Sequence, residues 1–134
     1  MEIPMADDQL TDKNGAPVSV AVDQANSAYA IMLDDGTVAG RTVFMAAPEA
    51  PGEWIFYHTE VSEEFGGRAL ATVLIAAAMA DVRAQGITVV PICPMVRAWL
   101  QKNAEEYEAA GGRVRKATGK DMEAVEDAVQ GGQA

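Results

Sequence analysis

The sequence predicts a mixed α/β protein with one core. Its first half contains segments that alternate apolar and polar residues and are rich in β-branched side chains, which is typical of strands. Its second half changes to a 3.6-residue period and then returns to a short apolar strand. A strand, a helix and a strand therefore follow one another, as in a parallel crossover. The length of 134 residues fits a single domain.

Four strands are expected in the first half, joined as an antiparallel meander. The turn Asp34–Gly36 is tight, because Asp and Gly tolerate positive φ. Ala46–Glu53 is a looser connection. The expected strands are Pro17–Asp23, Ala28–Leu33, Thr37–Met45 and Glu53–Val61.

A long helix is expected from Arg68 to Gln85, where the apolar residues fall on one stripe. Gly86 is suited to ending this helix. The strand Ile87–Cys93 is almost continuously apolar, as expected for a strand beside a parallel neighbour. The helix joining it to Trp54–Val61 is long enough for a crossover, so these two strands should be parallel. The stripe consists of Leu70, Val73, Leu74, Ala77, Ala78 and Val82.

The chain beyond Cys93 is expected to add two helices. Pro94 suits the first turn of a helix that runs from Met95 to about Glu106. After Gly111-Gly112, the "RVRKA" segment forms a strand or a loop, and a short amphipathic helix follows, with Thr118 and Asp121 as a capping pair. The expected organisation is a flexible N-terminal segment (1–16), a main domain (17–110) and a C-terminal extension (111–134).

Composition excludes several classes of function. The net charge of −10 argues against nucleic acid as a partner, because phosphate binding needs a basic face. No apolar run approaches the length of a membrane span and no targeting segment is recognisable, so we expect a cytoplasmic protein without a membrane partner. The single cysteine, Cys93, cannot form an internal disulfide. With His58 as the single histidine, no metal site is expected.

The turn before the long helix is a candidate phosphate site. Its sequence, "EEFGGRALATVL", runs from Glu63 to Leu74. A helix N-terminus presents N–H groups and partial positive charge, and Gly66-Gly67 would let a phosphate approach the backbone. Arg68 adds a cation. Taken alone, Gly-Gly before a helix is also common in ordinary connections, so a plain helix start is the alternative.

Two motifs, "HTEV" (His58–Val61) and "VVPICP" (Val89–Pro94), flank the glycine turn and the long helix. With these anchors, the run His58–Tyr107 resembles the small, single-domain branch of the GNAT-type N-acetyltransferases. The resemblance implies a GNAT-like fold. It implies a reduced version of that fold, because only Gln24–Ser27 separates the first two strands, where larger members place two helices.

The resemblance also implies acetyl-CoA (coenzyme A) as the co-substrate. The turn would hold its pyrophosphate, and the pantetheine arm would lie between Trp54–Val61 and Ile87–Cys93. Pro91, which has no N–H, suits a place where strand pairing ends. The implied cofactor-binding residues are Val61, Gly66, Gly67, Arg68, Ala69, Leu70 and Ala71.

The turn departs from the family pattern, Gln/Arg-x-x-Gly-x-Gly/Ala. In that register Gly66 stands at the position of the leading Gln or Arg, and Ala69 and Ala71 stand at the two small positions. Ala69 suits its place if its φ is helical, because alanine favours helical geometry. The departure bears on how tightly the turn holds a pyrophosphate.

Three residues are candidates for catalysis: Cys93, Glu60 and His58. Cys93 is expected at the N-cap of its helix, where the helix dipole stabilises negative charge on sulfur. Its role is a covalent acetyl carrier, a proton donor to the leaving thiolate, or packing. Glu60 and His58 share one face of their strand, and either can take the proton of an amine acceptor. The alternatives are a strand histidine and a solvated carboxylate with structural roles only.

The resemblance leaves two functions open. The first is an acetyl-CoA-dependent N-acetyltransferase that acts on a primary amine, by direct attack or through Cys93. The acceptor site should be open, which leaves the acceptor unnamed. The second is a non-catalytic acyl-CoA-binding or protein-interaction module on the same scaffold. The protein is expected to be a monomer or a homodimer, with Met122, Val125 and Val129 covering its own sheet or a second copy.

Overall fold

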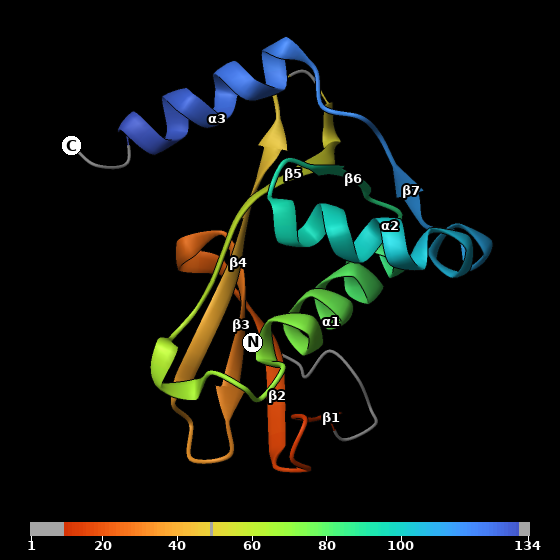
Figure 1. Ribbon diagram of the computed structural model, residues 1–134. Coiled ribbons are helices and arrows are strands. Elements are labelled where there is room, and N and C mark those ends of the chain that lie inside the picture. The colour runs from red at the N-terminus through yellow and green to blue at the C-terminus, as the bar shows by residue number, and fades with distance from the viewer. Residues whose placement is uncertain (1–9, 49, 132–134) are drawn as a thin grey trace. The chain divides into compact units, whose positions relative to one another are not determined.

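A computed structural model describes residues 10–48 and 50–131 of the protein. In this part of the chain, seven strands pair in sequence order from β1 to β7 and three α-helices accompany them (Figure 1). The prediction of a mixed α/β, GNAT-like fold is confirmed. The chain divides into two compact units. One consists of the residues up to Val43 with His58–Asp81, and the other of Phe44–Tyr57 with the residues from Val82 onward.

The first unit contains the antiparallel meander. β1 pairs with β2, β2 with β3, and β3 with β4, all antiparallel. The predicted first and second strands have the bounds of β2 and β3. Residues 1–9 of the expected flexible segment lie outside the described residues, and the rest of that segment supplies β1 and a turn. The bounds are β1 Leu10–Thr11, β2 Pro17–Asp23, β3 Ala28–Leu33 and β4 Val38–Ala47.

A single short turn connects β2 to β3. It is the 3₁₀ turn η1 (Gln24–Asn26), and Ser27 after it takes a left-handed conformation with φ 47°. The connection is therefore as short as the sequence predicts, in keeping with a reduced fold.

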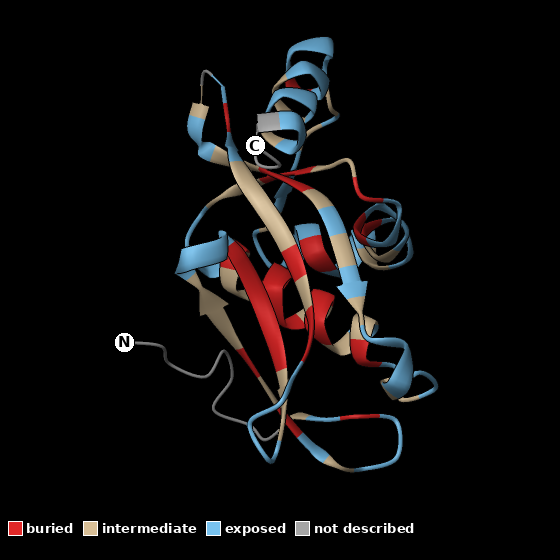
Figure 2. Ribbon diagram, turned by 90° about the vertical axis from the view of Figure 1, so that its left-hand side faces the viewer, coloured by how far each residue is buried: buried red, intermediate tan, exposed pale blue. Residues whose placement is uncertain are grey.

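The core of the first unit is formed by its strands and by α1 (Leu70–Ala84). The α1 side chains Leu70, Leu74 and Ala78 are buried, as predicted for the apolar stripe (buried residues are red in Figure 2). Burying a leucine side chain contributes about 1.5–3 kcal/mol. Tyr29 of β3 is fully buried, and its hydroxyl donates a hydrogen bond to Asp81 of α1 at 2.6 Å. This bond satisfies the polar end of an otherwise apolar side chain.

The second unit contains the parallel part of the sheet. β5 (Ala50–Val61) pairs in parallel with β6 (Thr88–Pro91), and β6 pairs in parallel with β7 (Arg113–Val114). The predicted parallel crossover is confirmed. Val89 and Val90 of β6 are fully buried, as the continuous apolar run of that strand predicts.

The end of α1 has the geometry predicted for Gly86. Gly86 has φ 74°, and its N–H donates to the carbonyl of Arg83 at 3.0 Å. The N–H of Ile87 donates to the carbonyl of Val82, also at 3.0 Å. These two bonds form a Schellman motif, which satisfies carbonyls that the helix end leaves unpaired.

The helix α2 (Pro94–Ala109) ends around a buried aromatic side chain. Tyr107 is 1% exposed, and it meets the ring of Trp99 edge-on at 6.0 Å between centroids. A Cβ at Gly112 would lie 2.3 Å from the Tyr107 ring, so this close approach requires glycine. Tyr107 therefore packs in the core.

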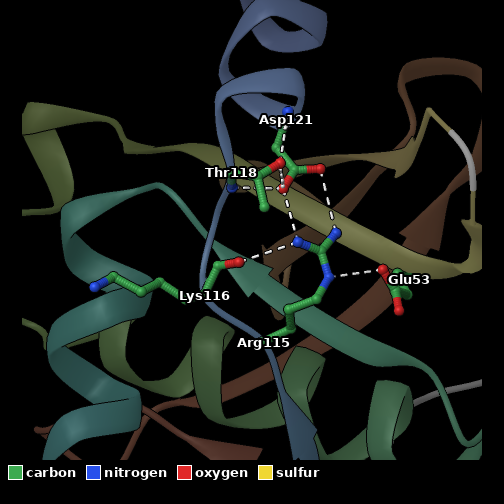
Figure 3. A network of polar contacts seen from close by, with 5 residues as sticks. All are labelled: Glu53, Arg115, Lys116, Thr118 and Asp121. Atoms are coloured by element: carbon green, nitrogen blue, oxygen red, sulfur yellow. Dashed lines mark hydrogen bonds and ion pairs between the residues drawn. The ribbon is translucent and has the colours of Figure 1, made fainter.

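The C-terminal extension consists of β7 and α3 (Gly119–Gly131), and residues 132–134 lie outside the described part of the chain. The predicted capping pair is confirmed, since Asp121 accepts a hydrogen bond from the Thr118 N–H at 2.8 Å. Asp121 also binds Arg115, whose Nη1 and Nη2 lie 2.8 and 3.2 Å from its two oxygens (Figure 3). Arg115 Nε donates to Glu53 of β5 at 2.7 Å. One guanidinium thus ties the extension to a sheet strand.

The Asp121 carboxyl is almost inaccessible to water, with 3% of its side chain exposed. Its hydrogen bonds from Arg115 lower its pKa to about 2, against the opposing effect of burial. Asp121 is therefore ionised in the folded protein at neutral pH, and Arg115 balances its charge.

Candidate functional site

The turn that precedes α1 has an irregular backbone. The 3₁₀ turn η2 (Glu63–Phe65) leads into Gly66, whose φ of −61° and ψ of 153° are ordinary extended values. Gly67 has φ 82° and Ala69 has φ 59°, both in the left-handed region. The helix begins at Leu70, two residues later than predicted, because a residue in the left-handed conformation cannot belong to a right-handed helix.

These angles show which positions of the turn require small residues. Positive φ falls on Gly67 and Ala69, whereas Gly66 needs no special conformational freedom. The helical φ expected for Ala69 is therefore wrong. A left-handed conformation costs a residue with a Cβ roughly 1–2 kcal/mol. The backbone is therefore strained at Ala69, and glycine would adopt the same conformation without that strain.

The N–H groups at the start of α1 are the polar groups that this turn offers a ligand. The first helical hydrogen bond runs from the Val73 N–H to the Ala69 carbonyl at 3.2 Å, so the N–H groups of Leu70 and Ala71 precede it. The Gly66 N–H already donates to Glu63 at 3.0 Å. Ala69 is exposed and Leu70 is 2% exposed. A 15-residue helix adds the positive end of its dipole here.

Arg68 lies in this turn and contacts a residue that the sequence did not single out. Its Nε donates to the carboxylate of Asp12, whose side chain is fully buried. Its guanidinium also lies over the ring of Phe65, 5.9 Å from the centroid. The positive charge of Arg68 is thus balanced inside the protein. Asp12 carries no motif signal, and it is 56 residues away from Arg68 in sequence.

Asp12 holds its own loop as well as Arg68. Its Oδ1 accepts hydrogen bonds from the N–H groups of Asn14 at 2.8 Å and Ala16 at 2.9 Å. Burial opposes ionisation of this carboxyl, but the hydrogen bonds from Ala16, Arg68 and Asn14 outweigh burial and keep the pKa of Asp12 below its ordinary value. The group is a buried carboxylate with a partner on each oxygen.

The end of β5 carries the two proposed base candidates. His58 Nε2 and Glu60 Oε1 are 3.3 Å apart, and their side chains are 57% and 62% exposed. Thr59 faces the other way, with its hydroxyl 2.8 Å from that of Thr42. The side chains of His58 and Glu60 thus lie on one face of the strand. The two groups can exchange a proton with each other and with water.

The backbone of β4 approaches the same end of β5 closely. A Cβ at Gly40 would lie 2.5 Å from the Glu60 carbonyl oxygen and 2.8 Å from a Val61 methyl group. The N–H of Ser62 donates to the Ala39 carbonyl at 2.8 Å. Glycine at position 40 therefore allows β4 to lie directly against the backbone that carries Glu60 and Val61.

Cys93 occupies the position at which β6 gives way to α2. It is the N-cap residue of α2, with Pro94 as the first helical residue. The N–H groups of Ile92 and Cys93 both donate to the Phe56 carbonyl, at 3.0 and 2.9 Å. Cys93 is 3% exposed, and its side chain does not cap the helix by a hydrogen bond. The buried position is the one that a packing role requires.

Pairing between β5 and β6 ends just before Cys93. The last partners in the register are Phe56 and Pro91, whereas β5 itself continues to Val61. The register thus ends at the proline, where the sequence predicts that strand pairing ends. The Ile92 N–H beyond it still donates to the Phe56 carbonyl, so the missing N–H of Pro91 is not itself what ends the pairing with β5.

Metal-binding groups and membrane spans are two further features with functional meaning. Within residues 10–48 and 50–131, no three His, Cys, Asp or Glu side chains gather in a way that could hold a metal ion. In the same ranges, no helix is long and apolar enough to span a bilayer.

Comparison with known protein families gives a match. A family model described as GCN5-related N-acetyl-transferase matches residues 28–110, which is more than half of the chain. No curated protein matches the sequence. The matched range includes every candidate site residue from His58 to Cys93. It leaves out Asp12 at one end and Arg115 with Asp121 at the other.

Proposed function

The chain belongs to the GCN5-related N-acetyltransferase family, and we propose that it transfers an acetyl group from acetyl-CoA to a primary amine. The match over residues 28–110 is the observation that carries this proposal. Acetyl-CoA is the co-substrate that the family implies. The family does not specify the acceptor.

The turn before α1 is the proposed site of the coenzyme A pyrophosphate. The N–H groups of Leu70 and Ala71 precede the first hydrogen bond of α1, and the helix dipole favours an anion there. Gly67 and Ala69 bend the backbone so that the chain enters the helix at Leu70. Because Asp12 balances the charge of Arg68, backbone N–H groups are proposed to provide most of the attraction for the phosphates.

The pantetheine arm is proposed to pair with the part of β5 that follows Phe56. The register with β6 ends there, and β5 continues through His58 and Glu60 to Val61. An extended pantetheine chain carries amides that can form strand-like hydrogen bonds with such a backbone. In this arrangement a Val61 N–H would polarise the thioester carbonyl.

Glu60 and His58 are proposed to remove the proton of the incoming ammonium group. A carboxylate and an imidazole 3.3 Å apart can pass a proton on, and both are accessible to an acceptor from solvent. The neutral amine then attacks the thioester carbon. A C–N bond forms, the C–S bond breaks, and the coenzyme A thiolate takes up a proton.

Direct attack is the favoured route over an acetyl-cysteine intermediate. In the second route the Cys93 sulfur would form a bond to the acetyl carbon as the coenzyme A thiolate leaves, and the amine would then displace Cys93. That route needs an accessible sulfur, and Cys93 is 3% exposed. Proton donation to the leaving thiolate and packing against the cofactor are the other roles proposed for Cys93.

A second candidate function is binding of acyl-CoA without transfer. Ala69 favours it, because a methyl group stands at a left-handed position where the phosphate must approach. The exposed His58–Glu60 pair favours transfer, because a binding module has no need of a base.

Three measurements test the proposal. Isothermal titration with acetyl-CoA should give saturable binding, and no binding at millimolar ligand would contradict both candidate functions. Thiol release from acetyl-CoA should be faster with an amine acceptor from a panel than without any amine, where only hydrolysis releases the thiol. Binding without amine-dependent release would support the second candidate. Cys93→Ser should keep transfer activity if Cys93 only packs, whereas loss of activity with intact binding would give Cys93 a role in catalysis, as acetyl carrier or as proton donor.

A further inference from the structure

We infer that Asp12 is a positioning residue for the coenzyme A turn, which it holds in shape through Arg68. This inference rests on the proposed function, because it assigns a task to a residue outside the matched range 28–110. Asp12 does not touch the cofactor in this account. It acts on the residue that immediately precedes Ala69.

Two contacts from the N-terminal segment converge on Arg68. The side chain of Asp12 accepts the Nε–H of Arg68, and the N–H of Lys13 donates to the Arg68 carbonyl at 2.9 Å. One contact fixes the side chain and the other fixes the backbone. The peptide between Arg68 and Ala69 is thus held by two residues that are far from it in sequence, Asp12 being 56 positions away.

The segment that makes these contacts is itself closed by hydrogen bonds. The Asp12 N–H donates to the Ala16 carbonyl at 2.9 Å, and the Gly15 N–H donates to the Asp12 carbonyl at 3.1 Å. The Oδ1 atom of Asp12 accepts the N–H groups of Asn14 and Ala16. Asp12 therefore presents its other oxygen to Arg68 from a fixed position.

Ala69 explains why the turn needs such support. Its φ of 59° is strained for a residue with a Cβ, and an unsupported alanine would relax toward negative φ. That relaxation would rotate the peptides that open α1 and move the N–H groups of Leu70 and Ala71. Glycine at this position would hold the conformation without help. The Asp12–Arg68 contact thus compensates for the missing glycine.

Asp12→Asn tests this inference, with acetyl-CoA binding measured by isothermal titration. Asparagine keeps an oxygen for Asn14 and Ala16 but offers Arg68 an amide without charge. Loss of one charge-assisted hydrogen bond predicts about tenfold weaker binding. Asp23→Asn is the matched control, because Asp23 also accepts a hydrogen bond from an arginine Nε, at 3.1 Å, but its partner is Arg41 rather than Arg68. The control should bind like the wild type.

A double-mutant cycle with Ala69→Gly separates positioning from general stability. With glycine at position 69 the turn has little strain to resist, so Asp12→Asn should weaken binding by less than about threefold in that background. An equal loss in both backgrounds would overturn the inference. So would tighter binding by Asp12→Asn, since Arg68 would then be a phosphate ligand that Asp12 restrains.

The outcomes also distinguish this inference from the proposed function. If the wild type does not bind acetyl-CoA, the proposed function is contradicted, and the role of Asp12 is contradicted with it. If the wild type binds and Asp12→Asn binds equally well, only the role of Asp12 fails. Circular dichroism establishes that each variant is folded. Asp12→Ser, which can cap the loop but is too short to hold Arg68, provides the same test if Asp12→Asn does not fold.

Discussion

Among the residues that the structure describes, two buried carboxylates each bind an arginine, and the two pairs lie in different units. In the first unit Asp12 holds Arg68 in the turn before α1. In the second unit Asp121 holds Arg115, which also binds Glu53. Asp12, Arg115 and Asp121 lie outside the range that matches the family, 28–110. Asp12, on one side of the matched range, binds Arg68 within it, and Arg115, on the other side, binds Glu53 within it.

The two pairs differ in what the arginine touches. Arg68 precedes a strained turn at a helix N-terminus, so its fixation shapes a surface that a ligand can use. Arg115 joins β5 to the extension, and its guanidinium is bound by Glu53, Asp121 and the Lys116 carbonyl, 3.0 Å from Nη1. The same ion pair can therefore serve binding in one place and stability in the other. Four substitutions test that division.

Arg115→Met should give the largest loss of stability. It leaves the buried carboxylate of Asp121 without its cationic partner, which predicts a loss of about 3 kcal/mol in the free energy of unfolding. Urea denaturation measures this loss, and acetyl-CoA affinity should be unchanged. Arg113→Met, at an exposed position of β7, is the control and should change stability by less than about 0.5 kcal/mol. A large loss of acetyl-CoA affinity in Arg115→Met would contradict the assignment of Arg115 to stability rather than binding.

Lowering the pH should remove the contribution of Asp121 to the free energy of unfolding. Its folded pKa of about 2 lies below its ordinary value of 3.8, so the stabilisation is complete above about pH 4 and is lost as the pH falls toward 2. The difference predicts a loss of about 2 kcal/mol from this group. Asp121→Asn should lack this component when unfolding is followed from pH 5 to pH 2. Identical pH curves for the two proteins would contradict the assignment.

Ala69→Gly should stabilise the first unit. Relief of the left-handed strain predicts a gain of about 1 kcal/mol in thermal or urea unfolding, together with tighter binding of acetyl-CoA. Ala76→Gly has the opposite expectation, because position 76 lies inside α1, where glycine costs about 1 kcal/mol. Destabilisation by both substitutions would mean that Ala69 is not strained.

The exposed pair of Arg41 and Asp23 should matter least. Their side chains are 40% and 22% exposed, and Arg41 Nε lies 3.1 Å from Asp23 Oδ2. Exposed pairs of this kind contribute about 0–1 kcal/mol, so Arg41→Gln should change stability by less than about 0.5 kcal/mol. A larger loss in urea denaturation would show that burial does not distinguish the three arginine pairs.

Local patterns predicted most of the fold. The alternation of Pro17–Asp23 and Ala28–Leu33 predicted the bounds of β2 and β3, and Gly86 marked the end of α1. The capping pair Thr118–Asp121 was predictable because its members are three residues apart. Each of these features depends on neighbours in sequence, and such features can be read without a structure.

The parts of the site that depend on distant residues could not be predicted. Asp12 and Arg68 are 56 residues apart, and Arg115 and Glu53 are 62 apart, so no local pattern marks either pair. Distant contacts hold the peptide before Ala69, which is why a local argument for a helical φ at this residue was wrong. The position of Cys93 at the helix N-cap was predictable from Pro94, but its burial was not.

Nuclear magnetic resonance titration with coenzyme A tests whether the turn before α1 binds the pyrophosphate. Backbone amide spectra of the 14.1 kDa protein report on each N–H group separately. The resonances of Gly67, Ala69, Leu70 and Ala71 should shift most and saturate together. Saturable shifts that leave these four amides unchanged, or no shifts at millimolar coenzyme A, would contradict the assignment of this turn as the pyrophosphate site.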